Sequence, residues 1–110
     1  MGKFVKGDII IIPFPFSDLT SSKRRPALVL ADLKGNDLIL CQITSKTVFD
    51  NIAVPIDLAD IEYGSLNTAS NVRPNKLFTA DEHIALYKLG TLKENKLNKV
   101  IATIVSLLES

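Results

Sequence analysis

The sequence is poor in the residues that most catalytic and metal sites require, with one cysteine and one histidine in 110 residues. The single cysteine, Cys41, excludes an intramolecular disulfide and a zinc site made of cysteines alone. The single histidine, His83, excludes a pair of histidines as metal ligands or as a catalytic base and acid. None of the five glycines lies in a glycine-rich phosphate loop. We therefore predict that the protein uses no metal ion and no other cofactor.

Long apolar runs are also missing. No stretch approaches the ~18 consecutive apolar residues of a transmembrane helix, so we expect no membrane contact. The apolar run at residues 9–12 is too short for the core of a signal peptide and is followed by Pro13. We expect a cytoplasmic protein, and the chain length predicts a single domain over residues 1–110.

The formal net charge of +1 argues against a uniformly basic nucleic-acid-binding protein, but the charges are segregated along the chain. Residues 1–46 hold seven basic and four acidic side chains, a net charge of +3. Residues 47–85 carry −4 and residues 86–110 carry +2. A near-neutral total therefore hides a basic N-terminal part, although chance imbalance on a solvated surface explains the pattern equally well.

Short apolar, β-branched segments dominate the first two thirds of the chain. The expected strands are Asp8–Ile12, Ala27–Ala31, Leu38–Thr44, Ile52–Ile56, Lys76–Thr79 and Ile84–Leu89. The segment Gly35-Asn36-Asp37 predicts a hairpin turn between the second and third of them. Pro55 indicates an edge or an end of the sheet for the fourth. Such a succession suits a small antiparallel barrel or sandwich, over about residues 5–90.

The C-terminal part changes to helical periodicity, which predicts a helix over about residues 92–109. Thr91 and Glu94 match a capping box, with Thr91 as the N-cap, and Gly90 ends the preceding strand. One apolar face carries Leu97, Ile101, Ile104, Val105 and Leu108. Val100 and Leu107 widen that face, which indicates either contact with a partner subunit or a deeply seated helix.

Two polar clusters at strand junctions are the best candidates for a functional site. A Cys41–His83 dyad is not expected, because Cys41 lies in an apolar strand where a buried thiol is the better interpretation. The first cluster is residues 23–26 (KRRP) and the second is residues 44–47 (TSKT). A hairpin would bring Arg25 close to Thr44, and an arginine facing hydroxyls can bind a phosphate. The alternative is a basic turn beside a polar strand end, without a ligand.

Four segments resemble one protein family. They are residues 7–18 (GDIIIIPFPFSD), 23–30 (KRRPALVL), 42–45 (QITS) and 70–79 (SNVRPNKLFT). In this order and at these spacings they resemble the MazF/PemK-type toxins of bacterial toxin–antitoxin systems, from about residue 5 to residue 108. The resemblance implies a small SH3-like antiparallel β-barrel with a C-terminal helix, the fold of the MazF, PemK and CcdB toxins. It also implies a homodimer.

The resemblance further implies a metal-independent endoribonuclease, an mRNA interferase that cleaves single-stranded RNA at selected sequences. In such toxins the substrate 2′-hydroxyl attacks the adjacent phosphorus and leaves a 2′,3′-cyclic phosphate and a 5′-hydroxyl. The implied partner is a cognate antitoxin with an acidic, partly disordered segment. The alternative is a non-enzymatic toxin or binding module of the same fold that acts on a protein such as DNA gyrase.

The resemblance assigns the catalytic roles to Arg25 and Thr44. The other residues expected to bind RNA are Lys23, Arg24, Ser45, Phe16, Asp18 and Arg73. One departure from the family is Phe78, which precedes Thr79-Ala80-Asp81 where many members carry an arginine. We expect Arg73, five residues earlier, to approach the same groove.

Overall fold

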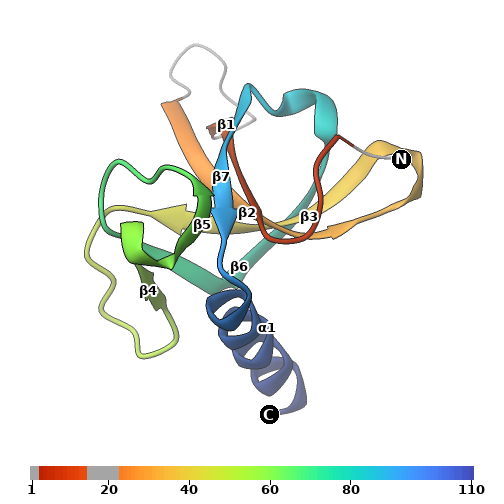
Figure 1. Ribbon diagram of the computed structural model, residues 1–110. Coiled ribbons are helices and arrows are strands. Elements are labelled where there is room, and N and C mark those ends of the chain that lie inside the picture. The colour runs from red at the N-terminus through yellow and green to blue at the C-terminus, as the bar shows by residue number, and fades with distance from the viewer. Residues whose placement is uncertain (1–2, 15–22) are drawn as a thin grey trace.

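The computed structural model describes residues 3–14 and 23–110, which form one antiparallel sheet and a C-terminal helix (Figure 1). The strands are β1 (Asp8–Phe14), β2 (Lys23–Asp32), β3 (Asp37–Thr44), β4 (Val54–Ile56), β5 (Ile61–Gly64), β6 (Ser70–Asp81) and β7 (Tyr87–Leu92). The helix is α1 (Glu94–Glu109). Short 3₁₀ turns occur at Lys34–Asn36, Leu58–Asp60 and Glu82–Ile84.

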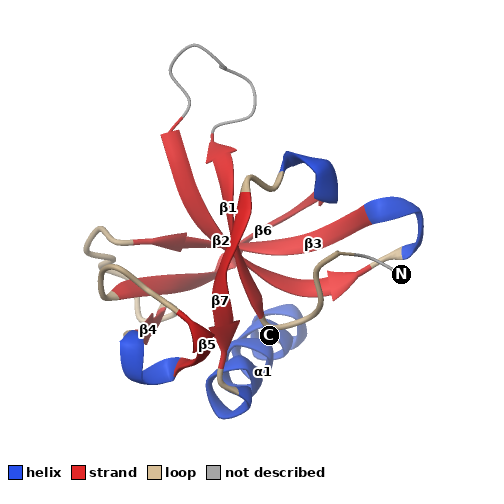
Figure 2. Ribbon diagram, turned by 45° about the horizontal axis from the view of Figure 1, so that its top comes forward, coloured by secondary structure: helices blue, strands red, loops and turns tan. Residues whose placement is uncertain are grey.

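The sheet has the strand order β4-β6-β3-β2-β1-β7-β5, so β4 and β5 form its two edges. It curls into a half-barrel whose strands fan out around a common centre (Figure 2), and α1 packs against β6 and β4. The predicted architecture, mainly antiparallel β with one C-terminal helix, is confirmed. Within the two described stretches of the chain, no helix has the length and apolarity needed to cross a membrane.

Both faces of β1 are buried, which explains its run of isoleucines. Ile9 belongs to a core cluster that includes Val100 of α1. Ile10 and Ile12 belong to a second cluster, with Leu40 of β3. Because successive side chains of a strand point to opposite faces, a continuous apolar run is what fills both clusters.

The hairpin between β2 and β3 forms at the predicted turn. Gly35 and Asn36 adopt positive φ angles of 80° and 74°, a conformation that glycine and asparagine tolerate best. The Leu33 N–H donates to the Asp37 carbonyl at 2.8 Å and closes the turn. The ladder that follows pairs Ala27 with Gln42.

The strand β6 is much longer than the expected segment Lys76–Thr79, because a bulge accommodates Pro74 inside it. Cys41 of β3 pairs with Leu77, whereas Ile43 pairs with Val72, so several residues of β6 face the single residue between them. A proline in such a bulge breaks no ladder hydrogen bond. The bulge therefore joins two pairing segments into one strand.

The last strand lies later in the chain than expected, and it packs closely against β5. Gly64 of β5 has a φ of 89°, and a Cβ added there would lie 2.5 Å from the Gly90 Cα. Gly90 therefore lies inside β7 and does not end a strand. The segment expected at Ile84–Leu89 is shifted to Tyr87–Leu92. The expected edge position of Pro55 is confirmed, since β4 is an edge strand.

The predicted capping box at Thr91 is wrong. Thr91 lies in β7, and its hydroxyl donates to Oδ1 of the buried Asp8 at 3.2 Å. Lys93 takes the N-cap position without a side-chain hydrogen bond, and α1 begins at Glu94. The Leu92 N–H donates to the Gly7 carbonyl at 2.9 Å, which keeps this segment extended. The Thr91 hydroxyl is therefore hydrogen-bonded to the Asp8 carboxylate and does not cap the helix.

Candidate functional site

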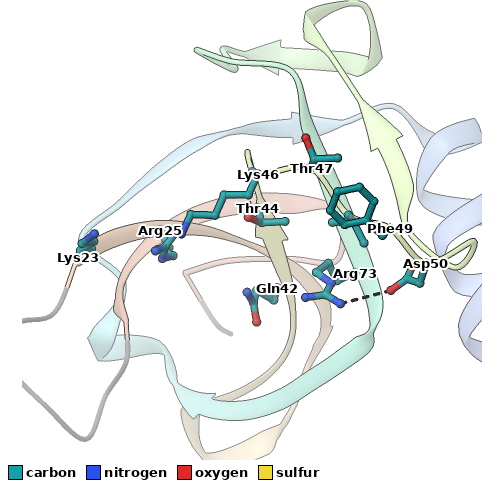
Figure 3. A pocket seen from close by; sticks show the side chains of 10 residues that line it. Lys23, Arg25, Gln42, Thr44, Lys46, Thr47, Phe49, Asp50 and Arg73 are labelled. Carbon is teal, nitrogen blue, oxygen red and sulfur yellow. Dashed lines mark hydrogen bonds and ion pairs between the residues drawn. The ribbon is translucent and has the colours of Figure 1, made fainter.

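A cleft of about 640 Å³ opens at the ends of β2 and β3 that lie away from their hairpin turn. It is lined by Lys23, Arg25, Gln42, Thr44, Lys46, Thr47, Val48, Phe49, Asp50 and Arg73. We call it the basic pocket, because four of these side chains are cationic and one is acidic. Figure 3 shows that its walls come from β2, β3, β6 and the loop that follows β3.

The β2–β3 hairpin brings Arg25 and Thr44 to the same pocket, as its predicted geometry requires. Their ladder pairs Ala27 with Gln42, and the same register continued by two residues sets Arg25 level with Thr44. Residues two apart in a strand share a face, so these four side chains line one side of the sheet end. The proximity is confirmed, and the catalytic roles of the two residues stay a prediction.

Thr44 is held in place by its own hydroxyl. Its side chain is buried, with 7% exposure, and its Oγ1 accepts a hydrogen bond from the Lys46 backbone N–H at 3.1 Å. A hydroxyl has two acceptor lone pairs and one proton to donate. A hydroxyl can accept and donate at the same time, so Thr44 can donate its proton to an oxygen of a ligand in the pocket while it accepts from the Lys46 N–H.

Arg73 lies in the same pocket, as expected, and is fixed at both its backbone and its side chain. Its carbonyl accepts a hydrogen bond from the Cys41 thiol at 3.0 Å, within the bulge of β6. Its Nη2 forms an ion pair with Asp50 Oδ2 at 3.3 Å, drawn as a dashed line in Figure 3. Its Nε is buried and has no hydrogen-bond partner among the described residues. The side chain as a whole is 24% exposed, so the exposed part of the guanidinium can contact an anion in the pocket.

Asp50 holds the loop after β3 to the rest of the pocket. Its Oδ1 accepts hydrogen bonds from the backbone N–H groups of Ile52 and Ala53, both at 3.0 Å. These two hydrogen bonds are the main reason that the pKa of Asp50 lies below its usual value, and the contact with Arg73 lowers it further. The carboxylate is therefore ionised at neutral pH and pairs with Arg73.

Of the remaining predicted residues, two line a second pocket and two lie outside the described residues. Arg24 and Ser45 line a second, smaller pocket of about 250 Å³, which Arg25 also lines. Asn67, Thr68 and Tyr87 contribute to its walls. The two pockets thus meet at Arg25. Two further expected RNA-binding residues lie outside the described residues, namely Phe16 and Asp18.

Phe78, at the position where many family members carry arginine, lines neither of these two pockets. Phe78 is half-buried and packs against the core cluster that contains Ile10 and Leu40. The loop residues Phe49 and Asp50 were not expected in the site. The sequence gives little indication of them, because a phenylalanine next to an aspartate in a polar loop is not specific to a binding site.

The two residues considered for a catalytic dyad lie in different environments, one buried and one exposed. Cys41 is buried, and burial raises the pKa of its thiol to about 12, which keeps it protonated. His83 is exposed and contacts Asp81, with 2.6 Å between Nδ1 and Oδ1. Across residues 3–14 and 23–110, no three His, Cys, Asp or Glu side chains are grouped so that they could hold a metal ion.

The fold is similar to those of several solved toxin structures. It matches MazF of Deinococcus radiodurans in a MazE–MazF complex, with a TM-score of 0.78 and 20% identity over 96% of each chain. It matches an endoribonuclease from a mycobacterial species, in complex with its cognate antitoxin, with a TM-score of 0.74 and 15% identity over 99% of this chain and 96% of that one. The Mycobacterium tuberculosis toxin MazF-mt6 gives 0.70 and 22%, over 93% and 96%. These likenesses establish a MazF-like fold, as expected.

Among curated proteins, none matches the sequence closely enough to count as a relative. A family model does match, that of the PemK-like, MazF-like toxins of type II toxin–antitoxin systems, over residues 5–108. This range covers nearly the whole chain and includes the four segments that resemble the family. The chain therefore belongs to the PemK-like, MazF-like toxin family of type II toxin–antitoxin systems.

Proposed function

We propose that this toxin is a metal-independent endoribonuclease that cleaves single-stranded RNA at selected sequences. One observation carries the proposal: Arg25, Arg73 and Thr44 line a single pocket. Two guanidinium groups and a hydroxyl form a set of donors suited to a phosphodiester. Neighbours of the same fold that are named endoribonucleases support this activity.

In the proposed reaction, the substrate supplies its own nucleophile. The 2′-oxygen forms a bond to the adjacent phosphorus, and the bond from phosphorus to the 5′-oxygen breaks. The 2′-hydroxyl loses its proton and the departing 5′-oxygen gains one. The products carry a 2′,3′-cyclic phosphate and a 5′-hydroxyl. The chemistry therefore requires neither a metal-bound hydroxide nor a nucleophilic side chain from the protein.

The side chains of the basic pocket stabilise the charge that builds up on the phosphorane. An arginine guanidinium keeps its charge throughout the physiological pH range, so Arg25 acts by electrostatic stabilisation. Thr44 donates its hydroxyl proton to a non-bridging oxygen while its own oxygen accepts from the Lys46 N–H. Lys23 and Lys46 lie exposed in the same pocket and attract the RNA backbone.

The cognate antitoxin is proposed to compete with RNA for this surface. An acidic segment that folds on binding would meet the same cationic side chains as the phosphates do. Solved neighbours of this fold include complexes of a toxin with its antitoxin. We further propose that the protein works in the cytoplasm as a homodimer, since two copies would extend the binding surface along the RNA.

The test is to incubate the purified protein with a mixed-sequence single-stranded RNA and a chelator, and to map the new ends. We expect cleavage at a restricted set of sequences, with cyclic-phosphate ends. Arg25→Ala should lower the rate by about 10²–10³-fold, the effect of removing one donor to a developing oxyanion. Lys99→Ala, an exposed cation on α1 outside the pocket, is the matched control and should cleave normally.

Failure of the folded wild-type protein to cleave RNA at any concentration would overturn the proposal. Binding of DNA gyrase by that same preparation would then favour the non-enzymatic alternative. If a co-expressed acidic antitoxin binds the protein without blocking cleavage, the proposed competition is wrong.

A further inference from the structure

The loop between β3 and β4 presents an aromatic ring to solvent at the basic pocket. The Phe49 side chain is 95% exposed, more than any other large hydrophobic side chain in the described part of the protein. Figure 3 shows its ring on the side of the pocket where Arg73 and Asp50 also lie. An exposed phenylalanine contributes nothing to the core, so packing does not explain its presence here.

The loop that carries Phe49 is held at both ends. On one side, the Lys46 N–H donates to Thr44 Oγ1 at 3.1 Å. On the other, Asp50 accepts from the backbone of Ile52 and Ala53 and forms its 3.3 Å ion pair with Arg73. These contacts fix the backbone on either side of position 49. The ring is therefore displayed from an anchored loop that lines the same pocket as Arg73.

The surroundings of the ring favour a nucleic acid over an apolar protein segment as its partner. Of the charged residues that line the pocket, Lys23, Arg25, Lys46 and Arg73 are cationic, and the single acidic one, Asp50, is paired with Arg73. Among the described residues that line the pocket, Phe49 is the one aromatic side chain, and the one other large apolar residue, Val48, is half-buried. A lone aromatic ring among cations is the arrangement that single-strand-binding proteins use, with stacked bases and neutralised phosphates.

We propose that Phe49 is the base-stacking residue of the site, on which one nucleobase next to the cleaved bond stacks while Arg73 binds the phosphate beside it. This inference rests on the proposed ribonuclease function and adds a nucleotide subsite to it. Asp50 acts as a positioning residue, because it fixes both the loop and the guanidinium. Base–aromatic stacking is worth about 1–3 kcal/mol per base, which corresponds to roughly 5- to 150-fold in affinity.

The test measures binding of an oligonucleotide that contains a mapped cleavage site, with 2′-deoxyribose at the attacking position so that it is not cleaved. Phe49→Ala should weaken binding roughly 5- to 150-fold, and Phe49→Tyr should retain it. Tyr63→Ala is the matched control, because Tyr63 is also an exposed aromatic residue, at 70%, and lies on β5 outside the basic pocket. Binding by that variant should equal wild type.

An abasic scan separates stacking from an indirect effect. Abasic nucleotides are placed one at a time around the cleavage site, and each oligonucleotide is measured with wild type and with Phe49→Ala. If a base stacks on the ring, the loss caused by Phe49→Ala disappears at one abasic position and persists at the others. A uniform loss at all positions would overturn the stacking assignment.

The sequence contains no tryptophan, so Phe49→Trp creates a unique fluorescent reporter. Its emission should change on addition of the oligonucleotide, whereas that of a Tyr63→Trp control should not. If the wild type cleaves RNA but Phe49→Ala binds and cleaves like wild type, the stacking inference is wrong and the proposed function stands. The inference is also overturned if Phe49→Ala loses only antitoxin affinity. If the wild type neither binds nor cleaves RNA, both fail.

Discussion

Replacement of Thr44 by valine is the most direct probe of the hydroxyl in the basic pocket. Valine has nearly the same shape, so the packing of this buried side chain is retained while its oxygen is removed. The Lys46 N–H loses its 3.1 Å acceptor, but Lys46 is exposed and water can replace the lost partner. We therefore expect the free energy of unfolding to fall by no more than about 1 kcal/mol.

The effect on catalysis should be much larger than the effect on stability. The proposed role of the hydroxyl is to donate to an oxygen that gains charge in the transition state. A water molecule in place of the hydroxyl would first have to reorient, which costs free energy that the fixed side chain does not. Loss of one such donor costs about 10²–10³ in rate, or roughly 2.7–4 kcal/mol. Thr44→Ser keeps the oxygen and should retain the cleavage rate within about 10-fold.

The assay is single-turnover cleavage of an RNA with a mapped site, combined with urea unfolding of the same preparations. A folded Thr44→Val protein that cleaves within about threefold of wild type would refute the assignment of a donor role to the hydroxyl. Equal losses in Thr44→Val and Thr44→Ser would refute it too, because the serine keeps the oxygen.

Two further predictions concern the core. Val100→Ala removes two methyl groups from a fully buried side chain between α1 and the sheet. It should lower the free energy of unfolding, measured in urea, by about 2–3 kcal/mol. The control Val105→Ala, at a position that is 45% exposed, should change it by less than about 0.5 kcal/mol. Burial raises the pKa of the Cys41 thiol from 9.0 to about 12. Between these two pH values the thiol is protonated in the folded protein and deprotonated in the unfolded chain. The free energy of unfolding should therefore fall as the pH rises from 9.0 to about 12. Cys41→Ala should flatten this slope, and an identical slope in both proteins would contradict the reasoning.

Much of the site follows from local sequence signals. The Gly35-Asn36 turn fixes a hairpin, and the hairpin fixes the register that brings Arg25 beside Thr44. Both steps depend on residues close together in the chain, which is why the sequence alone was sufficient. The burial of residues 9–12 is equally local, since four successive isoleucines suit a strand covered on both faces.

The errors come from residues that interact over long separations. Thr91 has the residue type and spacing of an N-cap, but its hydroxyl binds Asp8, 83 positions away in the chain. The ion pair between Asp50 and Arg73 spans 23 positions and depends on where the β6 bulge places the arginine. No local pattern encodes either contact, so the helix start and the place of Asp50 in the pocket could be read only from the structure.

The way the β3–β4 loop is anchored has a consequence for how this toxin can evolve. The hydrogen bonds that shape the loop come from Thr44 and Asp50, and the almost fully exposed side chain at position 49 takes no part in them. Substitutions at this position therefore carry little penalty in folding. Under the proposed function, a lineage could exchange the ring for another side chain and so alter which RNA sequences are cut, while the sheet, Arg25 and Thr44 remain unchanged.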